Sequence, residues 1–266
     1  MPADPNLISS LRPIAEAVAD AARRETLKHF RAWDLETKSK EVDFDPVTVA
    51  DRDAETAMRA ILAEHRPDDG ILGEEHGTVE GTTGLTWVLD PIDGTRGYIS
   101  GTPTWGVLIA VSDETGPRMG IVDQPYVGER FCGTPDEAWV DGPLGRRPLK
   151  TKSTTRLEDA TLFTTFPEIG TADERLAFER VAPHAKLVRY GCDCYAYALL
   201  AAGQIDLVIE AGLQPYDIHA PIAVIEAAGG VITNWEGEPA HPGGRAVAAA
   251  TPELHAAAMA LLGQGA

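Results

Sequence analysis

The sequence lacks the features that mark several classes of protein. No uninterrupted apolar run approaches the ~18–20 residues that a membrane-spanning helix requires, so no membrane partner is expected. The first residues, Met1 to Asp4, contain no basic region followed by an apolar block, and this predicts that the chain carries no secretory signal. The three cysteines are an odd number, which together with the missing signal predicts a cytoplasmic location rather than a disulfide framework.

Positive charge is also scarce. Lys and Arg number 23 against 41 Asp and Glu, which gives a formal net charge of −18 at pH 7. Because the phosphate backbone of a nucleic acid binds to positive surface, this balance argues against nucleic acid as a partner. The excess carboxylates can solvate the surface or gather to bind cations, and composition alone leaves both interpretations open.

Two other residue types offer weak metal signals. Cys192 and Cys194 are separated by one residue, but a zinc site usually has four ligands and no second Cys or His pair lies at a ligand-like spacing. We therefore interpret the cysteines as free structural thiols. His219 lies two residues after Asp217, and we interpret it as a helix-surface histidine.

The hydrophobic pattern interleaves helical and strand periods along the whole chain, which predicts an α/β or α+β fold with layered sheets. The 266 residues suit one large domain or two smaller ones. The expected helices lie at about residues 7–30, 51–62, 173–181, 194–202, 218–228 and 252–262. The expected strands include 71–73, 87–89, 105–111, 120–122, 160–166, 185–190, 205–209 and 231–233, with a hairpin at 138–147.

Residues 90–95, with the sequence DPIDGT, carry the strongest chemical signal. An apolar strand ends at Asp90, and a tight turn after it can aim Asp90 and Asp93 at one point. Two adjacent carboxylates repel each other unless a cation lies between them, and hard oxygen ligands suit Mg²⁺ or Mn²⁺. Gly94 allows close backbone approach, and free N–H groups at a helix start attract phosphate. Taken alone, the segment could also be an ordinary capped turn.

Further acidic residues stand at similar positions. Glu74 and Glu75 follow an apolar run, and Asp51 and Asp217 stand at expected helix starts. Taken singly, acids on a loop are usually solvated, and an Asp at a helix start is usually an N-cap. A functional role for these acidic residues is indicated only when they are considered together.

Taken together, these segments resemble the inositol monophosphatase superfamily of lithium-sensitive, magnesium-dependent phosphatases. The resemblance covers nearly the whole chain and implies a layered αβαβα sandwich, an α/β (α+β) fold. It also implies an N-terminal lobe over residues 1–150 that binds metal and phosphate, and a C-terminal lobe over 151–266 that carries Asp217 and the specificity residues. The matching segments are 47–51 (VTVAD), 73–75 (GEE), 90–95 (DPIDGT), 216–217 (YD) and 226–230 (EAAGG).

The resemblance implies a set of metal ligands. Glu74, Asp90 and the carbonyl oxygen of Ile92 are expected to hold one Mg²⁺, and Asp90, Asp93 and Asp217 a second, with Asp90 bridging. Two metals about 4 Å apart can clamp both the attacking and the leaving oxygen. Two or three Mg²⁺ per active site are expected, with Mn²⁺ as a possible substitute and Li⁺ as an inhibitor.

Roles in catalysis follow from the same resemblance. Glu74 and Thr95 are expected to orient the attacking water, and Asp51 to assist through a hydrogen-bond chain to Thr95. The phosphate is expected to lie against Asp93 and the backbone N–H groups of Gly94 and Thr95. The substrate is expected to be a small phosphate ester, and the protein a homodimer.

Within the superfamily the chain most resembles the histidinol-phosphate phosphatase branch. Tyr216 stands where the inositol branch usually has Trp before the metal-binding Asp. Asp193 and Glu210 are the candidate specificity residues, because an acidic pocket suits the ammonium and imidazole groups of histidinol. Arg189 is expected to approach the phosphate or a neighbouring acid; for all three residues an exposed charge or structural salt bridge is the alternative. The supporting segments are 93–106, 189–197 and 210–217.

The sequence therefore predicts a magnesium-dependent phosphate monoester hydrolase that acts on L-histidinol phosphate in histidine biosynthesis. An inositol-1-phosphate phosphatase, or a broader sugar or nucleotide phosphatase, is the alternative among enzymes. A metal- or phosphate-binding regulator is the non-enzymatic alternative, and the presence of Glu74 and Thr95, which serve the water, disfavours it.

Overall fold

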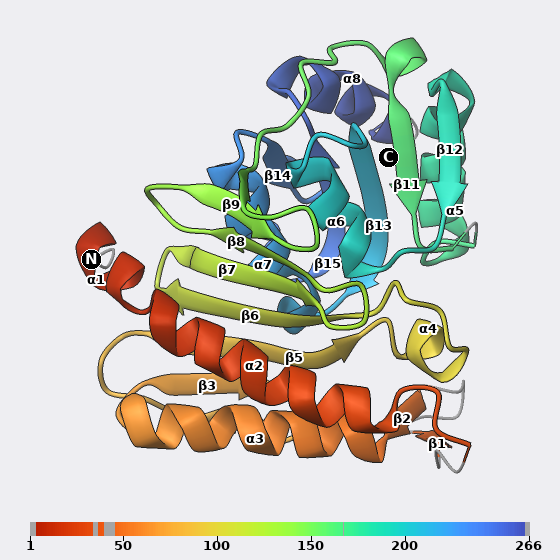
Figure 1. The fold of residues 1–266 in the computed structure, drawn as a ribbon. Coiled ribbons are helices and arrows are strands. Elements are labelled where there is room, and N and C mark those ends of the chain that lie inside the picture. Colours follow the sequence, from red (N-terminus) through yellow and green to blue (C-terminus); the bar gives the residue numbers. More distant parts are fainter. Residues whose placement is uncertain (1–3, 34–36, 40–45, 167, 264–266) are drawn as a thin grey trace.

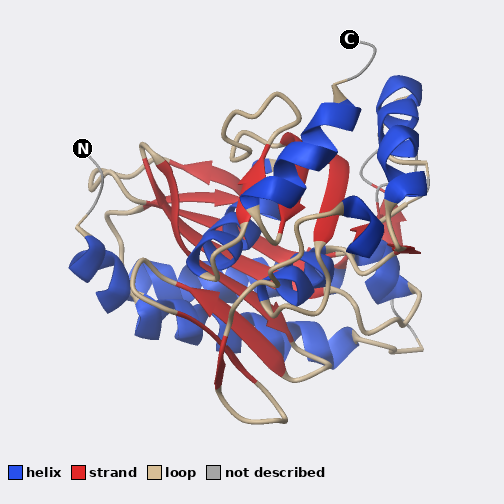
Figure 2. Ribbon diagram, turned by 90° about the horizontal axis from the view of Figure 1, so that it is seen from above, coloured by secondary structure: helices blue, strands red, loops and turns tan. Residues whose placement is uncertain are grey.

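Five layers, in the order helix, sheet, helix, sheet, helix, make up the molecule, as the computed structural model shows (Figure 1). It describes residues 4–33, 37–39, 46–166 and 168–263. Figure 2 views the layers from above and shows helices bordering the strands on both sides. The predicted αβαβα sandwich is confirmed. Within the described ranges, no helix has the length and apolarity needed to cross a membrane.

The bounds of the elements follow the chain in order. The helices are α1 Pro5–Ser10, α2 Arg12–His29, α3 Val49–His65, α4 Thr95–Ile99, α5 Ala172–Val181, α6 Cys194–Ala201, α7 Pro215–Ala227 and α8 Pro252–Leu262. The strands are β1 Thr37–Ser39, β2 Pro46–Thr48, β3 Gly70–Gly73, β4 Gly77–Val79, β5 Thr86–Asp93, β6 Gly106–Asp113, β7 Gly116–Gln124, β8 Glu129–Gly133, β9 Ala138–Asp141, β10 Arg147–Pro148, β11 Thr161–Thr164, β12 Leu187–Tyr190, β13 Leu207–Leu213, β14 Val231–Thr233 and β15 Gly244–Ala249.

Two large sheets form the second and fourth layers. The eight-stranded sheet has the order β10-β9-β8-β7-β6-β5-β3-β4, and its neighbours are antiparallel except for the parallel pair β3 and β5. The five-stranded sheet has the order β12-β11-β13-β15-β14. All strands of the first sheet end before residue 150, and all strands of the second begin after it. The boundary between two lobes at residue 150 stays a prediction.

The core fills the three spaces between the layers. Adjacent residues of β5 serve different spaces, because successive side chains of a strand point to opposite faces. Trp87 packs under the N-terminal helices, whereas Val88 packs into the space that α6 and α7 occupy between the sheets. A third cluster, with Phe178 and Leu254, lies between the five-stranded sheet and the outer helices α5 and α8. Helices α6 and α7 are thus enclosed between the two sheets.

The single helix predicted over residues 7–30 is wrong in one respect, because the structure has two helices there. Helix α1 ends at Ser10 and α2 begins at Arg12. Pro13 lies in the first turn of α2, where a missing N–H costs nothing, but it would clash with the preceding turn of a continuous helix. The expected hairpin at 138–147 is confirmed by the antiparallel pair β9 and β10.

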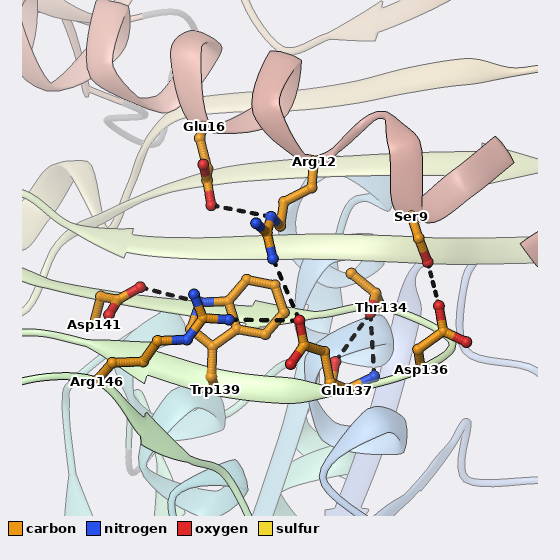
Figure 3. A network of polar contacts seen from close by, with 9 residues as sticks. All are labelled: Ser9, Arg12, Glu16, Thr134, Asp136, Glu137, Trp139, Asp141 and Arg146. Carbon is orange, nitrogen blue, oxygen red and sulfur yellow. Dashed lines mark hydrogen bonds and ion pairs between the residues drawn. The ribbon is translucent and has the colours of Figure 1, made fainter. Parts of the chain in front are cut away.

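A cluster of charged and aromatic side chains attaches α2 to the far edge of the eight-stranded sheet (Figure 3). The indole ring of Trp139 on β9 contacts two guanidinium groups, with the ring centroid 5.2 Å from Cζ of Arg12 and 4.4 Å from Cζ of Arg146. Both cations also reach one carboxylate oxygen of Glu137, at 3.3 and 3.5 Å. The shared ring and carboxylate fix α2 against the sheet at the end away from the acidic cluster described next.

Candidate active site

Strand β5 brings two carboxylates to one side through an irregularity in its pairing with β6. Asp90 pairs with Leu108, and Asp93 pairs with Gly106. Three steps along β5 therefore face two steps along β6, so β5 contains one extra residue. Residues an odd number apart point to opposite faces of a regular strand, and the extra residue returns Asp93 to the side of Asp90. The tight turn predicted after Asp90 is thus a bulge inside the strand.

A third carboxylate comes from the other half of the chain. Asp217 stands in the first turn of α7, where its Oδ2 accepts a hydrogen bond of 2.7 Å from the backbone N–H of Gln214. The Asp90, Asp93 and Asp217 side chains each offer an oxygen atom, and these atoms all lie within 4.8 Å of one another. Asp217 is thus not the N-cap that the sequence suggested; the N-cap is Gln214, and Asp217 is the third residue of the helix, whose carboxylate binds the N-cap N–H and also faces the cluster.

Glu74 reaches the same place through the parallel pairing of β3 and β5. Gly73 lies opposite Leu89, so the residues that follow them, Glu74 and Asp90, emerge side by side. The Glu74 N–H donates to the Leu89 carbonyl oxygen at 3.2 Å. A cavity of about 430 Å³ opens here, and its lining includes Glu74, Asp90, Ile92, Asp93, Gly94, Thr95, Asp193 and Asp217. The structure thus gathers all predicted metal ligands around one cavity.

The electrostatics of this cluster favour a cation. Burial, followed by the charges of Glu74, Asp93 and Asp217, raises the pKa of Asp90 well above its usual range. Burial and the Asp217 charge raise the pKa of Asp93 to about 7, against hydrogen bonds from Cys194. The donors are carboxylate oxygens, which suit Mg²⁺ and Mn²⁺ rather than softer metals. The residues therefore fit the hard divalent cation that the sequence predicts.

The metal-free protein is expected to lose stability as the pH rises from 5 to 8. Burial raises the folded-state pKa of Asp93 and of Glu210 to about 7, above the unfolded values of ~3.9 and ~4.3. The folded state then binds more protons than the unfolded state between those values, so the free energy of unfolding falls through this window. Because Mg²⁺ competes with protons, it should raise the Tm by roughly 5 °C more at pH 8 than at pH 5.

Thermal unfolding in chelator and in Mg²⁺, at pH 5 to 8, measures this effect. The Asp93→Asn variant is the control, and its Tm should depend less on pH because it lacks one of the raised carboxylates. A metal-free Tm that stays constant or increases over this range would contradict the electrostatic argument.

Gly94 forms the corner between β5 and α4. Its φ of 81° and ψ of 41° lie in the left-handed region, which favours glycine. A Cβ atom at this position would also lie 2.8 Å from Cγ of Asp193. Any side chain at Gly94 would therefore push Asp193 away from the cluster, so the backbone comes this close to Asp193 only because residue 94 is glycine. Its predicted contact with phosphate stays a proposal.

A second cavity of about 170 Å³ adjoins the first. The two share Asp93, Phe166, Asp193, Gly212 and Asp217 in their linings. The second cavity also contains Glu210, Thr165 and Tyr197. Of the predicted specificity residues, Asp193 therefore borders both cavities, whereas Glu210 lines only the second and Glu74 only the first.

Threonines hold the buried carboxylate of Glu210. Its Oε1 accepts hydrogen bonds from the Thr165 N–H at 2.6 Å and the Thr165 hydroxyl at 2.8 Å, and its Oε2 accepts one from the Thr164 hydroxyl at 3.3 Å. Burial nevertheless raises the pKa of Glu210 to about 7. The buried hydroxyl of Tyr197 has no hydrogen-bond partner in the described part of the chain. The second cavity thus combines a fixed carboxylate with an unpaired hydroxyl.

Asp193 stands in a strained backbone segment. Gly191, Cys192 and Asp193 all have positive φ, of 89°, 87° and 44°. For a non-glycine residue such a conformation costs ~1–3 kcal/mol, and it is typical of functional sites. The next N–H, of Cys194, donates to Oδ2 of Asp93 at 2.6 Å. The strained segment therefore connects the specificity candidate Asp193 directly to the acidic cluster.

Comparison with known proteins agrees with this geometry. The model of the inositol monophosphatase family matches residues 8–265. The chain belongs to this family. It is 34% identical over 270 residues to a histidinol-phosphatase of Streptomyces coelicolor, covering 98% of this chain and 99% of that protein. A solved inositol monophosphatase from Zymomonas mobilis superposes with a TM-score of 0.83 and 35% identity, covering 96% of this chain and 97% of the other.

A third relative shows that the names of the relatives do not agree on one substrate. The chain is 43% identical over 228 residues to the bifunctional phosphatase IMPL2 of Arabidopsis thaliana, and the match covers 85% of this chain but 64% of that protein. The chain therefore spans less than two thirds of that relative. The relatives are named as histidinol-phosphatases and inositol monophosphatases, so the predicted class of phosphoric monoester hydrolase is confirmed, while the substrate is not.

Two predicted residues lie away from both cavities. Asp51 is buried at the start of α3, where it accepts hydrogen bonds from the N–H and the hydroxyl of Thr48, at 2.8 and 2.7 Å. The Thr95 hydroxyl, to which Asp51 was expected to connect, donates to the Ile92 carbonyl oxygen at 3.0 Å. Arg189 is exposed on the edge strand β12. Neither Asp51 nor Arg189 belongs to the described linings of the two cavities, so their predicted roles stay proposals.

The interpretation of His219 as a surface residue is wrong. His219 is buried in α7, where Nε2 donates to the His241 carbonyl oxygen at 2.8 Å and Nδ1 accepts from the Ser112 hydroxyl at 2.8 Å. Burial lowers the pKa of His219 to about 4, so the ring is neutral. It joins α7 to its neighbours and takes no part in the acidic cluster. The three cysteines are free thiols, as predicted.

Proposed function

We propose that the chain hydrolyses L-histidinol phosphate to L-histidinol and phosphate, with Mg²⁺, in histidine biosynthesis. The observation that carries this proposal is the second cavity, in which the buried Glu210 carboxylate and Asp193 lie beside the acidic cluster. A phosphate ester bound with its phosphate at the metal-binding carboxylates extends its leaving group into this cavity. The ammonium and imidazole N–H groups of histidinol are donors that such carboxylates accept.

The metal ligands are proposed as the resemblance implies. Glu74, Asp90 and the Ile92 carbonyl oxygen would hold one Mg²⁺, and Asp90, Asp93 and Asp217 a second, with a third ion optional, Mn²⁺ as a substitute and Li⁺ as an inhibitor. When bound, these ions neutralise phosphoryl charge and lower the pKa of water. The same buried carboxylates that repel one another without metal are then paired with opposite charge.

The chain's own groups position the water and the phosphate. The Thr95 hydroxyl uses its proton on the Ile92 carbonyl, which leaves its lone pairs to accept a hydrogen bond from water. Glu74 can accept the other proton of the same water, so the water's lone pair is directed toward phosphorus. The N–H groups of Gly94 and Thr95 would hold phosphate oxygens. Asp51 would support the turn at Gly94 and Thr95 from α3. Arg189, on the edge strand β12, would approach the phosphate or a neighbouring acid.

An inositol phosphate remains the second candidate, because its hydroxyl groups can also donate to Glu210, and the Zymomonas mobilis neighbour is an inositol monophosphatase. A broader sugar or nucleotide phosphatase would share the same metal chemistry.

The sequence-based expectations of a homodimer and a cytoplasmic location stay predictions. Light scattering on the protein as it elutes from a size-exclusion column tests the first.

Phosphate release from L-histidinol phosphate and from inositol 1-phosphate, each with Mg²⁺ and with chelator, tests the proposal. We expect a kcat/KM at least roughly 100-fold higher for histidinol phosphate, because a pocket built for a charged donor rejects a neutral one strongly. A preference for inositol 1-phosphate would keep the metal chemistry and refute the substrate. The absence of turnover on both, and on a panel of sugar and nucleotide phosphates, would favour the binding regulator.

A further inference from the structure

A buried carboxylate outside the active site holds the loop that carries Glu74. Glu55 lies in the middle of α3 and its side chain is fully buried. Its Oε2 accepts a hydrogen bond of 2.6 Å from the Glu75 N–H, and its Oε1 accepts one of 3.2 Å from the His76 N–H. These donors belong to the two residues that directly follow Glu74. The side chain of Glu55 therefore replaces the sheet partners that this turn of the backbone lacks.

Arg59, one turn further along α3, completes the arrangement. Its Nε donates to Oε1 of Glu55 at 2.7 Å, and its Nη2 donates to the Gly77 carbonyl oxygen. The charge of Glu55 is thus paired, and the same pair of side chains holds the turn between β3 and β4 from Glu75 to Gly77. A buried ion pair that also satisfies backbone groups is strongly destabilising to break.

The chain comes so close to Glu55 that only glycine fits. A Cβ atom on Gly73 would lie 2.0 Å from Oε1 of Glu55 and 2.8 Å from Nη2 of Arg59. The backbone of Glu74 is therefore fixed from both directions. Its own N–H is bound to Leu89 of β5, and the next two N–H groups are bound to Glu55 of α3.

We propose that Glu55 is a positioning residue for the metal centre, which holds the Glu74 carboxylate beside Asp90 by binding the two backbone N–H groups that follow it. This inference rests on the proposed metal-dependent function, in which Glu74 is a ligand and orients the water. Groups that orient metal ligands typically contribute ~10–100-fold to metal affinity. Glu55 itself lies outside the described lining of the cavity and has no part in the chemistry.

The Glu55→Gln variant tests the proposal. Gln keeps the shape of Glu but replaces one carboxylate oxygen with an NH₂ group. This donor then meets another donor, either the Arg59 guanidinium or a backbone N–H, so one hydrogen bond is lost. The probe is Mn²⁺, whose free concentration is followed by its EPR signal in the absence of substrate. We expect the dissociation constant for Mn²⁺ to rise about tenfold. At saturating Mg²⁺, kcat should stay within about threefold of the wild type, because the ligands themselves are unchanged.

Asp69→Asn is the matched control. Asp69 is also a buried carboxylate at the junction of α3 and β3, and it accepts hydrogen bonds from Arg66, Thr83 and Trp87. It lies just before the opposite end of β3, about 16 Å along the chain from Glu74 by the rise of a strand. Both variants should lower the Tm, whereas Mn²⁺ affinity should fall in Glu55→Gln alone.

The outcomes separate this inference from the proposed function. Equal Mn²⁺ affinity in Glu55→Gln and the wild type, with a lowered Tm, would show that Glu55 is structural only. Should Glu55→Gln not fold, Glu55→Asp keeps the charge for Arg59 but shortens the reach, and it should weaken Mn²⁺ binding about threefold; an unchanged affinity would overturn the proposal. A wild-type protein that binds no Mn²⁺ would refute both proposals, whatever the variants do.

Discussion

Replacing Asp90 with Asn is expected to lower kcat at least about a thousandfold while raising the Tm of the metal-free protein. Asp90 belongs to both proposed ligand sets, and metal stabilisation of transition-state charge contributes several kcal/mol, which corresponds to roughly 10³-fold in rate. The hydrogen bond from the Ile92 N–H to Oδ1, at 3.0 Å, can be kept by the Asn oxygen. The strand should therefore retain its bulge, and the loss of activity would report on charge and ligation.

The gain in stability has a separate cause. Asp90 is 1% exposed, and burial with three neighbouring carboxylates raises its pKa well above its usual range. Removal of this charge relieves repulsion that the folded state tolerates for its function. Rates of phosphate release and thermal unfolding in chelator measure the two effects on the same samples.

Asp69→Asn should show the reverse pattern and serves as the control. Its carboxylate is paired with Arg66, and the Arg66 hydrogen bonds help to hold the pKa of Asp69 below its usual value against the opposing effect of burial. Its loss should lower the Tm and leave kcat unchanged. The interpretation of the cluster would be refuted by an Asp90→Asn protein that keeps more than about a tenth of the wild-type kcat.

The members of the acidic cluster could be predicted because each lies after an apolar run or near the start of a helix; their role as metal ligands stays a prediction. Asp90 follows the apolar residues 87–89 of β5, and Asp217 stands in the first turn of α7, so both positions are visible in the sequence. The bulge that turns Asp93 toward Asp90 could not be predicted, since it is defined by pairing with β6, a strand distant in sequence. The motif thus indicates which residues meet, and the sheet determines how they meet.

The residues that support the site could not be recognised from the sequence around them. Glu55 is typical of the polar face of an amphipathic helix, and it is buried only because the β3–β4 hairpin folds over α3. Tyr197 and Thr165 likewise become candidate binding residues only when α6, β13 and the loop after β11 come together to form the second cavity. His219 was misinterpreted because α7 is enclosed between two sheets, so that every residue from 218 to 225 is buried.

Replacing Glu210 with Gln is expected to lower kcat/KM for L-histidinol phosphate by roughly 10–100-fold, the value of one hydrogen bond to a charged group. Phosphate release from p-nitrophenyl phosphate, whose leaving group offers no cation or N–H, should change less than about threefold. Gln fits the site, because its oxygen can keep both hydrogen bonds from Thr165 while its NH₂ group donates to the Thr164 hydroxyl. The change therefore removes the charge and one acceptor, and leaves the cavity its shape.

The comparison between substrates determines what Glu210 does. Glu129→Gln is the control, because this carboxylate accepts a hydrogen bond from the Tyr195 hydroxyl at 2.7 Å and belongs to neither described cavity lining. It should leave both rates unchanged. Equal losses on both substrates in Glu210→Gln would mean that Glu210 acts through the metal cluster. A loss on inositol 1-phosphate as large as that on histidinol phosphate would mean that the cavity recognises hydroxyl donors rather than a cation, and the substrate would then have to be sought among neutral polyol phosphates.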